Sequence, residues 1–209
     1  GLYAVVAWWP GLPESLVQAA GWAVFLAGLG GVFCSVMIYA FTRREFWSFP
    51  RTLIKFFGTS MILGLATAWL SILMVGLVSD QAAAERVMTT VRPHLIRGLL
   101  LASLLKLGYE ALLLRHLLSW RNSALKRSAL LMIGPLSNPV LARFAAGLLG
   151  GVLMPLFVLR PLDATFVGNA ASMMIAFMIF LACLLGELLE RYLFFAAVSA
   201  PRMPGNVRR

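Results

Sequence analysis

Apolar residues fill five long stretches of this chain, and polar residues gather in the shorter segments between them. A helix needs about 20 mainly apolar residues to cross the hydrocarbon core of a bilayer. Each stretch reaches that length, and none shows the alternating segments of about ten residues that are typical of a membrane barrel. The predicted membrane-spanning helices cover residues 16–41, 52–78, 94–118, 141–160 and 168–198.

These stretches predict an all-α fold, a polytopic transmembrane helix bundle, because lipid offers no partner to a free backbone group and helices satisfy their own. No internal repeat, Gly-Ser linker or low-complexity tract divides the sequence, so we expect residues 1–209 to form a single transmembrane domain. Small residues in the first and fourth stretches should let helices pack closely. Pro155 should kink the fourth helix, because proline removes a backbone hydrogen bond.

The composition agrees with a membrane protein. Hydrophobic residues make up 61% of the chain and charged residues 12%, whereas about a quarter of the residues in a typical soluble domain are charged. The formal net charge of +10 would suit a nucleic-acid-binding protein, but the basic residues are dispersed over segments at helix ends. The positive-inside rule explains such an excess, so we expect no nucleic-acid partner.

The basic residues also predict the orientation of the chain. They are concentrated in the first loop, the third loop and the C-terminal tail: Arg43, Arg44, Arg51 and Lys55, then Arg115, Arg121, Lys126, Arg127 and Arg143, then Arg202, Arg208 and Arg209. In the second loop, Arg86, Arg92 and Arg97 are partly offset by Asp80 and Glu85, and the fourth loop has only Arg160. The first and third loops and the C-terminus are therefore expected in the cytoplasm.

Metal and haem sites are not expected in this chain. Cys34 and Cys183 lie inside predicted helices without CxxC or Cys/His spacing, which indicates packing residues rather than metal ligands. The two histidines, His94 and His116, lie at opposite ends of the third predicted helix, roughly 33 Å apart at the rise of an α-helix. They cannot both ligate one haem.

Ionisable residues deep in the third predicted helix are the first functional candidates. Lys106, Tyr109 and Glu110 fall near its middle, where a charge costs several kcal/mol unless it is paired or hydrated. Lys106 and Glu110 are four residues apart, so they share a helix face and can neutralise each other. Two interpretations remain open: a buried pair that fixes helix packing, and a pair that handles protons or faces a quinone.

A second ionisable cluster lies in the last predicted helix. Glu187 and Arg191 are again four residues apart, with Glu190 beside them, so two carboxylates and one guanidinium can form a network. This network either locks the helix at the cytoplasmic boundary or takes part in ligand or proton traffic. His116 either bonds a quinone carbonyl or a partner, or is a solvated interfacial histidine.

Two motifs carry a family resemblance. One is the run GELLERYLFF at residues 186–195 in the last predicted helix, and the other is SVMIYA at 35–40, followed by FWSFPRT at 46–52 and KFF at 55–57. They resemble the final-helix signature and the middle region of the dimethyl sulfoxide reductase anchor subunit family, particularly its sulfite dehydrogenase-type branch. The similarity covers most of the chain, from about residue 30 to residue 205.

The resemblance implies a non-catalytic, haem-free membrane anchor subunit of a molybdenum/iron–sulfur oxidoreductase complex. Such a subunit holds no redox cofactor of its own, anchors a four-cluster iron–sulfur subunit and a molybdopterin catalytic subunit, and exchanges electrons with the quinone pool. Sulfite oxidation is the expected reaction of the complex, with formate, sulfoxide and other sulfur oxyanions left open. The location implied is the bacterial inner (cytoplasmic) membrane.

The resemblance also implies a longer subunit. Members of the family usually have about eight or more helices, of which this chain would supply the last five, and the chain begins at Gly1 rather than Met. We therefore expect three helices upstream, with both termini in the cytoplasm. The chain departs from the family pattern because it lacks the His-Leu-Gly-x-Pro segment of the early helices, which contribute much of the quinone site.

The quinone and proton candidates are therefore contributing residues only: Lys106, Tyr109, Glu110, His116, Glu187, Glu190 and Arg191. The basic, aromatic first loop is the candidate docking surface for the iron–sulfur subunit, through Arg43, Arg44, Trp47 and Arg51, although a solvated positive-inside loop explains it too. A secondary transporter or permease with an intramembrane Lys–Glu pair is the alternative function, and the absence of an inverted repeat argues against it. An assembly scaffold without a redox role is the third interpretation.

Overall fold

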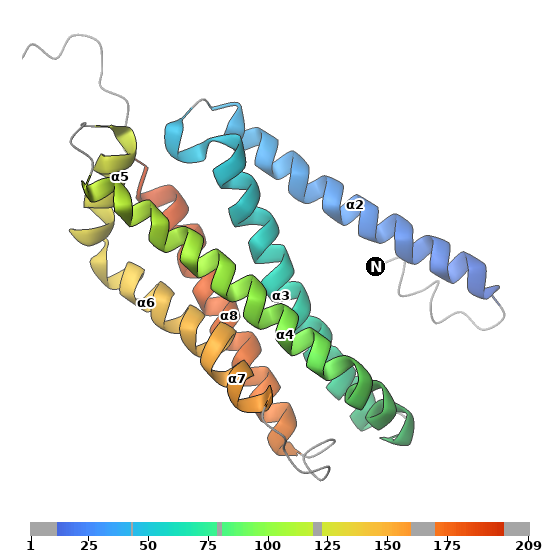
Figure 1. Cartoon of the computed structure of the whole chain (residues 1–209). Coiled ribbons are helices and arrows are strands. Elements are labelled where there is room, and N and C mark those ends of the chain that lie inside the picture. Colours follow the sequence, from blue (N-terminus) through green and yellow to red (C-terminus); the bar gives the residue numbers. More distant parts are fainter. Residues whose placement is uncertain (1–11, 43, 79–80, 119–122, 160–169, 199–209) are drawn as a thin grey trace, which may run out of the picture. The chain divides into compact units, whose positions relative to one another are not determined.

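The computed structural model describes residues 12–42, 44–78, 81–118, 123–159 and 170–198, and every element in these ranges is a helix (Figure 1). The predicted all-α fold is thus confirmed for the described chain. Two compact units are present, Gly1–Phe56 and Phe57–Arg209. The boundary between them falls inside one continuous helix, α3 (Phe49–Val78), so this division does not test the predicted single domain.

The first unit consists of α2 (Glu14–Ala40), the short 3-10 helix η1 (Glu45–Trp47) and the start of α3. Pro13 directly precedes α2, and its carbonyl accepts hydrogen bonds from the backbone N–H groups of Leu16 and Val17. Proline suits this position because its missing N–H would have no partner in the first turn of a helix. The boundaries of α2 agree with the predicted helix at 16–41.

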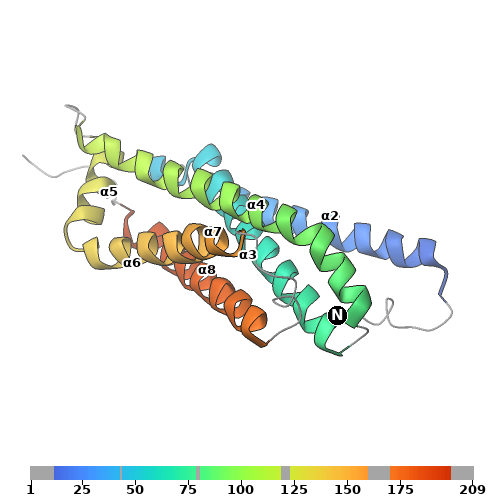
Figure 2. The same cartoon turned by 60° about the horizontal axis from the view of Figure 1, so that its bottom comes forward.

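The second unit contains the rest of α3 and all later helices. These are α4 (Gln81–Leu114) with the 3-10 turn η2 (Arg115–Leu118), α5 (Ala124–Ile133), α6 (Ser137–Leu148), the π-helical turn η3 (Leu149–Leu153), α7 (Met154–Leu159) and α8 (Ala170–Ala196). Figures 1 and 2 show α4, the α6–α7 segment and α8 running side by side. The main packing of α6 is against α8.

Two helical regions extend into segments predicted as loops. α4 begins at Gln81 rather than near residue 94, so Arg92 and Arg97 lie within a helix and not in a loop. The predicted third loop contains α5, which Ser123 caps by accepting a hydrogen bond from the backbone N–H of Lys126 at 3.2 Å. An apolar-length criterion misses both regions because neither is continuously apolar.

The fourth predicted helix is a composite of three segments. It begins at Ser137 in α6, passes through η3 and continues as α7 to Leu159. Pro155 is the second residue of α7. A π-helical turn is a common cause of helix bending and is frequent at functional sites. The irregular geometry therefore precedes the proline at which a kink was predicted.

Four helices in the described chain are long and apolar enough to cross a membrane: Glu14–Ala40, Phe49–Gly76, Ser137–Leu159 and Ala170–Ala196. The structure thus supports an all-α membrane-type bundle with four candidate spans. The fifth predicted span, at 94–118, does not belong to this group. Its helix α4 is long enough, with 34 residues, but Arg97, Lys106 and Glu110 interrupt its apolar part.

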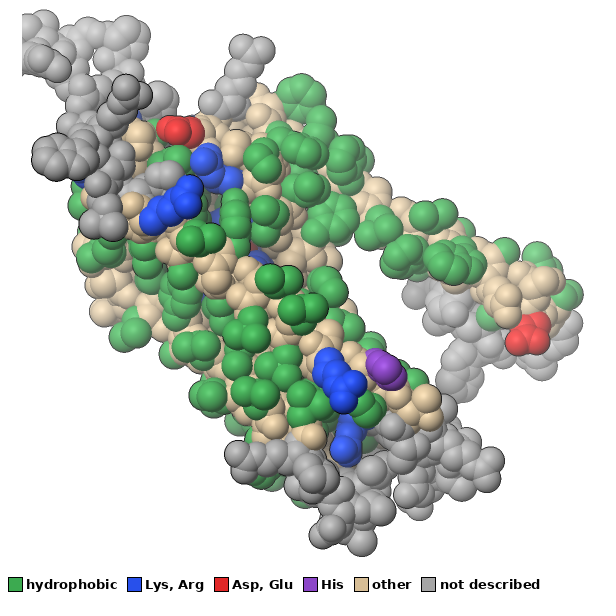
Figure 3. Space-filling model, viewed as in Figure 1, with side chains coloured by type: hydrophobic (Ala, Val, Ile, Leu, Met, Phe, Trp, Pro, Cys, Tyr) green, Lys and Arg blue, Asp and Glu red, His purple; other side chains and the backbone are tan. Residues whose placement is uncertain are grey.

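Side chains in the second unit are distributed in the reverse of a soluble protein. On α4, Leu104 and Leu105 are 50% and 66% exposed, whereas Lys106 is 2% exposed. Figure 3 shows hydrophobic side chains over the middle of the visible face, with basic side chains toward its ends. A surface of this kind suits contact with lipid, since large apolar patches are rare on soluble monomers.

The core of the second unit follows a spacing of three and four residues along each helix, as helix packing requires. On α8 the buried positions are Ser172, Ala176, Ile179, Cys183, Gly186, Glu187, Glu190, Leu193 and Phe194. On α3 the series includes Ile62, Ala66, Trp69 and Leu73. Because charged residues occupy the same seam as apolar ones, the packing that closes the core also brings the charges together.

Candidate functional site: a buried charged cluster

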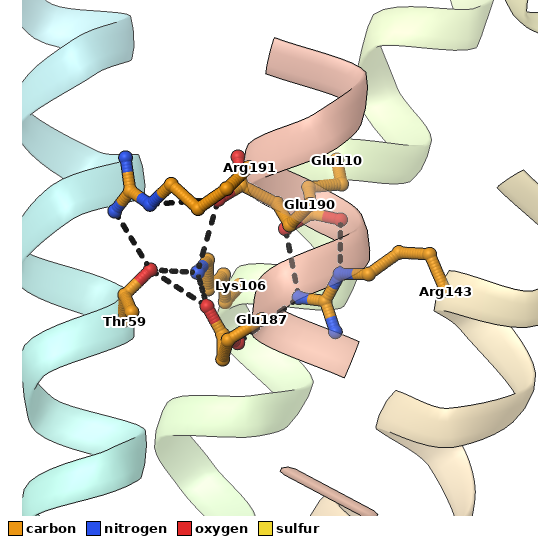
Figure 4. Close-up of polar contacts among 7 residues, drawn as sticks. All are labelled: Thr59, Lys106, Glu110, Arg143, Glu187, Glu190 and Arg191. Carbon is orange, nitrogen blue, oxygen red and sulfur yellow. Dashed lines mark hydrogen bonds and ion pairs between the residues drawn. The ribbon is translucent and has the colours of Figure 1, made fainter. Parts of the chain in front are cut away.

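Six charged side chains and one threonine meet inside the second unit, and we refer to them as the charged cluster (Figure 4). Its members are Thr59 on α3, Lys106 and Glu110 on α4, Arg143 on α6, and Glu187, Glu190 and Arg191 on α8. Five of the six charged side chains are at most 9% exposed, and that of Arg191 is 25% exposed. Three cations face three carboxylates, so the formal charges balance.

Glu187 is the centre of the cluster. Its Oε1 accepts a hydrogen bond from Nη2 of Arg143 at 3.2 Å, and its Oε2 accepts from Oγ1 of Thr59 at 2.6 Å and from Nζ of Lys106. One carboxylate on α8 therefore connects α3, α4 and α6. Charge-assisted hydrogen bonds of this type are roughly twice as strong as neutral ones.

Thr59 is the neutral member of the cluster. Its hydroxyl donates to Glu187 and accepts from Nζ of Lys106 at 2.8 Å and from Nη2 of Arg191 at 3.0 Å. A hydroxyl has one proton to donate and two lone pairs to accept with, so Thr59 can serve as donor and acceptor at the same time. Thr59 thereby joins the two cations at this end of the cluster to the central carboxylate.

Arg143 and Glu110 form a two-point ion pair. Nε of Arg143 donates to Oε2 of Glu110 at 3.2 Å, and Nη2 donates to Oε1 at 3.0 Å. Planar, two-point pairing with a carboxylate is a geometry that arginine provides and lysine does not. This pair connects α6 to α4.

The structure corrects the predicted pairing within single helices. The ion pairs of Lys106 are with Glu187 and Glu190 on α8, at 3.8 Å for Glu190, whereas Glu110 pairs with Arg143. The predicted network of Glu187, Glu190 and Arg191 is present in part. Nε of Arg191 lies 3.8 Å from Oε2 of Glu190, and Arg191 and Glu187 share a hydrogen-bonding partner in Thr59. Contacts between helices prevail because each helix presents these side chains to its neighbours in the core.

Glycines provide the space for the buried cations. A Cβ atom at Gly147 or at Gly186 would lie 2.8 Å or 2.9 Å from Nη1 of Arg143. A Cβ atom at Gly58 would lie 3.0 Å from Cδ of Lys106. In the fourth predicted helix the small residues thus serve close helix packing, as predicted, and in addition accommodate charged side chains. In the first predicted helix, Cβ atoms at Gly28, Gly30 and Gly31 would meet nothing within 4 Å, so the close packing predicted there is not present among the described residues.

Two members of the charged cluster, Thr59 and Arg143, were not predicted as site residues from the sequence. Arg143 was counted as a cytoplasmic loop residue, but it is 2% exposed and lies in α6. A usable signal was present in its spacing, because Arg143, Gly147 and Gly151 recur at four-residue intervals and so share one helix face. For Thr59, the signal was its register with Ile62 in the buried series of α3.

Two of the quinone and proton candidates, Tyr109 and His116, are not among the seven residues of the charged cluster. Tyr109 is half-buried on α4, next to Glu110 in the sequence. His116 belongs to η2, and its side chain lies outside the described part of the structure. Five of the seven candidates are therefore brought together: Lys106, Glu110, Glu187, Glu190 and Arg191.

The docking candidates of the first loop lie in the first unit, where aromatic side chains contact one another and the basic residue Arg44. The guanidinium of Arg44 lies 4.9 Å from the ring centre of Trp47, and the rings of Tyr39 and Trp47 pack edge to face at 5.4 Å between centres. Arg51 donates to the backbone carbonyl of Glu45 and, at 3.2 Å, to Oγ of Ser48. Arg43 lies outside the described residues. The described part of the loop is thus ordered by contacts of its own side chains.

The chemistry available to the charged cluster is the holding and transfer of protons. Carboxylates, a lysine and a hydroxyl follow one another at hydrogen-bonding distance inside an apolar bundle, where unpaired charges are costly. Among the described residues, no group of three or more His, Cys, Asp or Glu side chains is placed to hold a metal ion.

The chain matches no protein-family model, no curated protein and no solved structure.

Proposed function

We propose that this chain is a haem-free membrane anchor subunit of a molybdenum/iron–sulfur oxidoreductase complex. It binds quinone or quinol and passes electrons between a four-cluster iron–sulfur subunit and the quinone pool, while a molybdopterin subunit performs the substrate chemistry, for which sulfite oxidation is preferred. One observation carries the proposal. The charged residues of the GELLERYLFF motif, on which the family resemblance depends, all belong to the charged cluster.

The role we assign to the charged cluster is proton management. Quinone reduction consumes protons together with electrons, so a protonatable network beside the quinone has a use that a sealed ion pair does not. Arg191 supports this role, because it is the most exposed of the six charged side chains and contacts both Thr59 and Glu190. It gives the buried carboxylates a connection toward the surface of the unit.

The proposal includes a fifth span and an orientation. The outward leucines and inward charges of α4 suit a helix that crosses the membrane with its polar side chains turned toward its neighbours. We assign the chain to a bacterial inner membrane, with its C-terminus and first loop in the cytoplasm, as part of an eight-helix subunit. The iron–sulfur subunit would then dock on the first loop, at Arg44, Trp47 and Arg51.

A secondary transporter is the second candidate. Transporter sites are built at interrupted helices near the membrane midplane, and the π-helical turn η3 follows α6, which carries Arg143 of the charged cluster. In this alternative, Lys106 and its carboxylates would couple to an ion or a solute.

Purification of the intact complex in mild detergent tests the proposal. The expected result is that molybdenum and iron copurify with this chain and that the complex oxidises or reduces quinone analogues. A metal-free preparation that drives solute uptake in liposomes would favour the transporter. A metal-containing complex that is inert toward quinol would favour the scaffold.

Site variants test the role of the charged cluster within such a complex. Glu110→Gln and Glu187→Gln should slow quinone turnover and leave the dye-linked activity of the partner subunits intact. Glu14→Gln is the matched control, because Glu14 is exposed at the start of α2. Melting of each complex is measured in parallel, so that loss of fold is separated from loss of turnover. Unchanged quinone kinetics in both variants would reduce the charged cluster to a structural role.

A further inference from the structure

A small cavity lies against the charged cluster, between α4, the η3 turn and α8. Its lining includes Ser103, Arg143, Gly151, Cys183 and Glu187. The volume of the cavity, counted as the space that the centre of a water-sized sphere can occupy, is about 10 Å³. Roughly this much space is needed to hold one water molecule.

Ser103 points to an occupant of this cavity. It is 2% exposed, and its hydroxyl has no hydrogen-bonding partner among the described residues. Gly151 lies directly opposite, since a Cβ atom there would come within 2.6 Å of Cβ of Ser103. A buried hydroxyl without a partner is costly, and native structures usually satisfy such groups with protein or ordered water.

The lining of the cavity offers the mixture of donors and acceptors that water requires. Ser103 can donate and accept, the guanidinium of Arg143 donates, and the carboxylate of Glu187 accepts. Buried waters typically make two to four hydrogen bonds, and these three groups supply that number. The thiol of Cys183 adds a weak fourth partner.

We propose that a single water molecule occupies this cavity, bridges Ser103 to the Arg143–Glu187 ion pair and contacts the thiol of Cys183. The water extends the charged cluster along α4 and hydrates two charges that are otherwise surrounded by helices. Gly151 leaves room for Ser103 beside the cavity, since a Cβ atom at this position would lie 2.6 Å from Cβ of Ser103. The proposal holds whether or not the chain serves a quinone-linked complex.

Direct observation is the first test. Electron cryo-microscopy of the intact protein, at a resolution that shows ordered internal waters, should reveal a density peak within hydrogen-bonding distance of Oγ of Ser103. A cavity without density, in a map where other internal waters are visible, would overturn the proposal. This measurement needs no variant and so does not depend on how substitutions fold.

Infrared spectroscopy of Cys183 is the second test. The chain has two cysteines, so Cys34→Ala leaves Cys183 as the single source of the S–H stretching band. Since the structure shows no direct bond from Ser103 to the thiol, Ser103→Ala should shift this band by disturbing the bridging water. Ser35→Ala is the control, because Oγ of Ser35 donates to the carbonyl of Gly31 within α2. An unchanged band in the Ser103→Ala protein would contradict the proposal.

Discussion

Arg143 on α6 and Glu187 on α8 form a buried ion pair of 3.2 Å across 44 residues of sequence. Each also pairs with α4, Arg143 with Glu110 and Glu187 with Lys106. The charges therefore alternate in sign from Glu110 through Arg143 and Glu187 to Lys106. In such a series an inner member separates two like charges, so its removal should be more damaging than that of an outer member.

Glu187→Gln should strongly destabilise the fold, because Lys106 and Arg143 would lose the carboxylate between them. Breaking a buried pair by removing one partner costs about 3–5 kcal/mol, whereas exposed substitutions usually stay within about 0.5 kcal/mol. The measurement is the free energy of unfolding of the Glu187→Gln protein in mixed micelles, and Glu14→Gln is the exposed control. A Glu187→Gln protein as stable as that control would show that the carboxylate does not hold the helices together.

Arg143→Met should also be destabilising, and Glu110→Gln should rescue part of the loss. The single change leaves Glu110 without the cation that contacts it at two points, while the double change removes one charge of each sign. Contacting residues in one network typically show coupling energies of about 0.5–3 kcal/mol. Unfolding free energies of the two single variants and the double variant provide this coupling, and strict additivity would contradict the pairing.

Gly147→Ala should destabilise the second unit by crowding. The added Cβ atom would lie 2.8 Å from Nη1 of Arg143 and 2.9 Å from Cδ2 of Leu107, and overpacking typically costs about 1–3 kcal/mol. Gly64→Ala on α3 is the matched control, because a Cβ atom there meets nothing within 4 Å. Equal unfolding free energies for the two variants would mean that the packing around Arg143 is looser than described.

The sequence predicted the helices better than their partners. Apolar length located α2, α3, α6–α7 and α8, since crossing a bilayer imposes a minimum length. It also indicated Lys106 and Glu187 as ionisable residues inside predicted membrane-spanning helices. The pairing of these residues with each other was not predicted, because rules for residues four apart describe one helix, whereas neighbours in space are set by packing.

Arg143 shows a second limit of sequence reasoning. The positive-inside rule treats a basic residue near a helix end as solvated, so Arg143, which lies nearly two turns inside α6, was assigned to the cytoplasm. Its burial depends on carboxylates from two other helices, Glu110 and Glu187. No pattern local to α6 contains that information, although the glycines that follow on the same face indicate a close neighbour.

Trp47→Ala should weaken docking of the iron–sulfur subunit, if the first loop is the docking surface proposed above. The ring of Trp47 contacts Tyr39 and lies under the guanidinium of Arg44, so its loss removes the support of an exposed cation. The expected result is release of the partner subunits from washed membranes while this chain stays in the bilayer. Phe41→Ala is the control, since Phe41 is 76% exposed in the same loop. Full retention of the partners by the Trp47→Ala protein would locate docking elsewhere.

The fifth span is testable by accessibility of single cysteines placed on either side of α4. In a background with Cys34 and Cys183 replaced by alanine, Ser79→Cys precedes the helix and Ser119→Cys follows it. If α4 crosses the bilayer, an impermeant maleimide should label position 119 from the cytoplasmic face and position 79 from the opposite face. An unpaired charge opposes the insertion of a helix into the membrane. Lys106 and Glu110 each pair with an opposite charge on another helix, which lowers this cost for α4. Labelling of both positions from one face would mean that α4 lies along the bundle without crossing the membrane, and the chain would then have four spans.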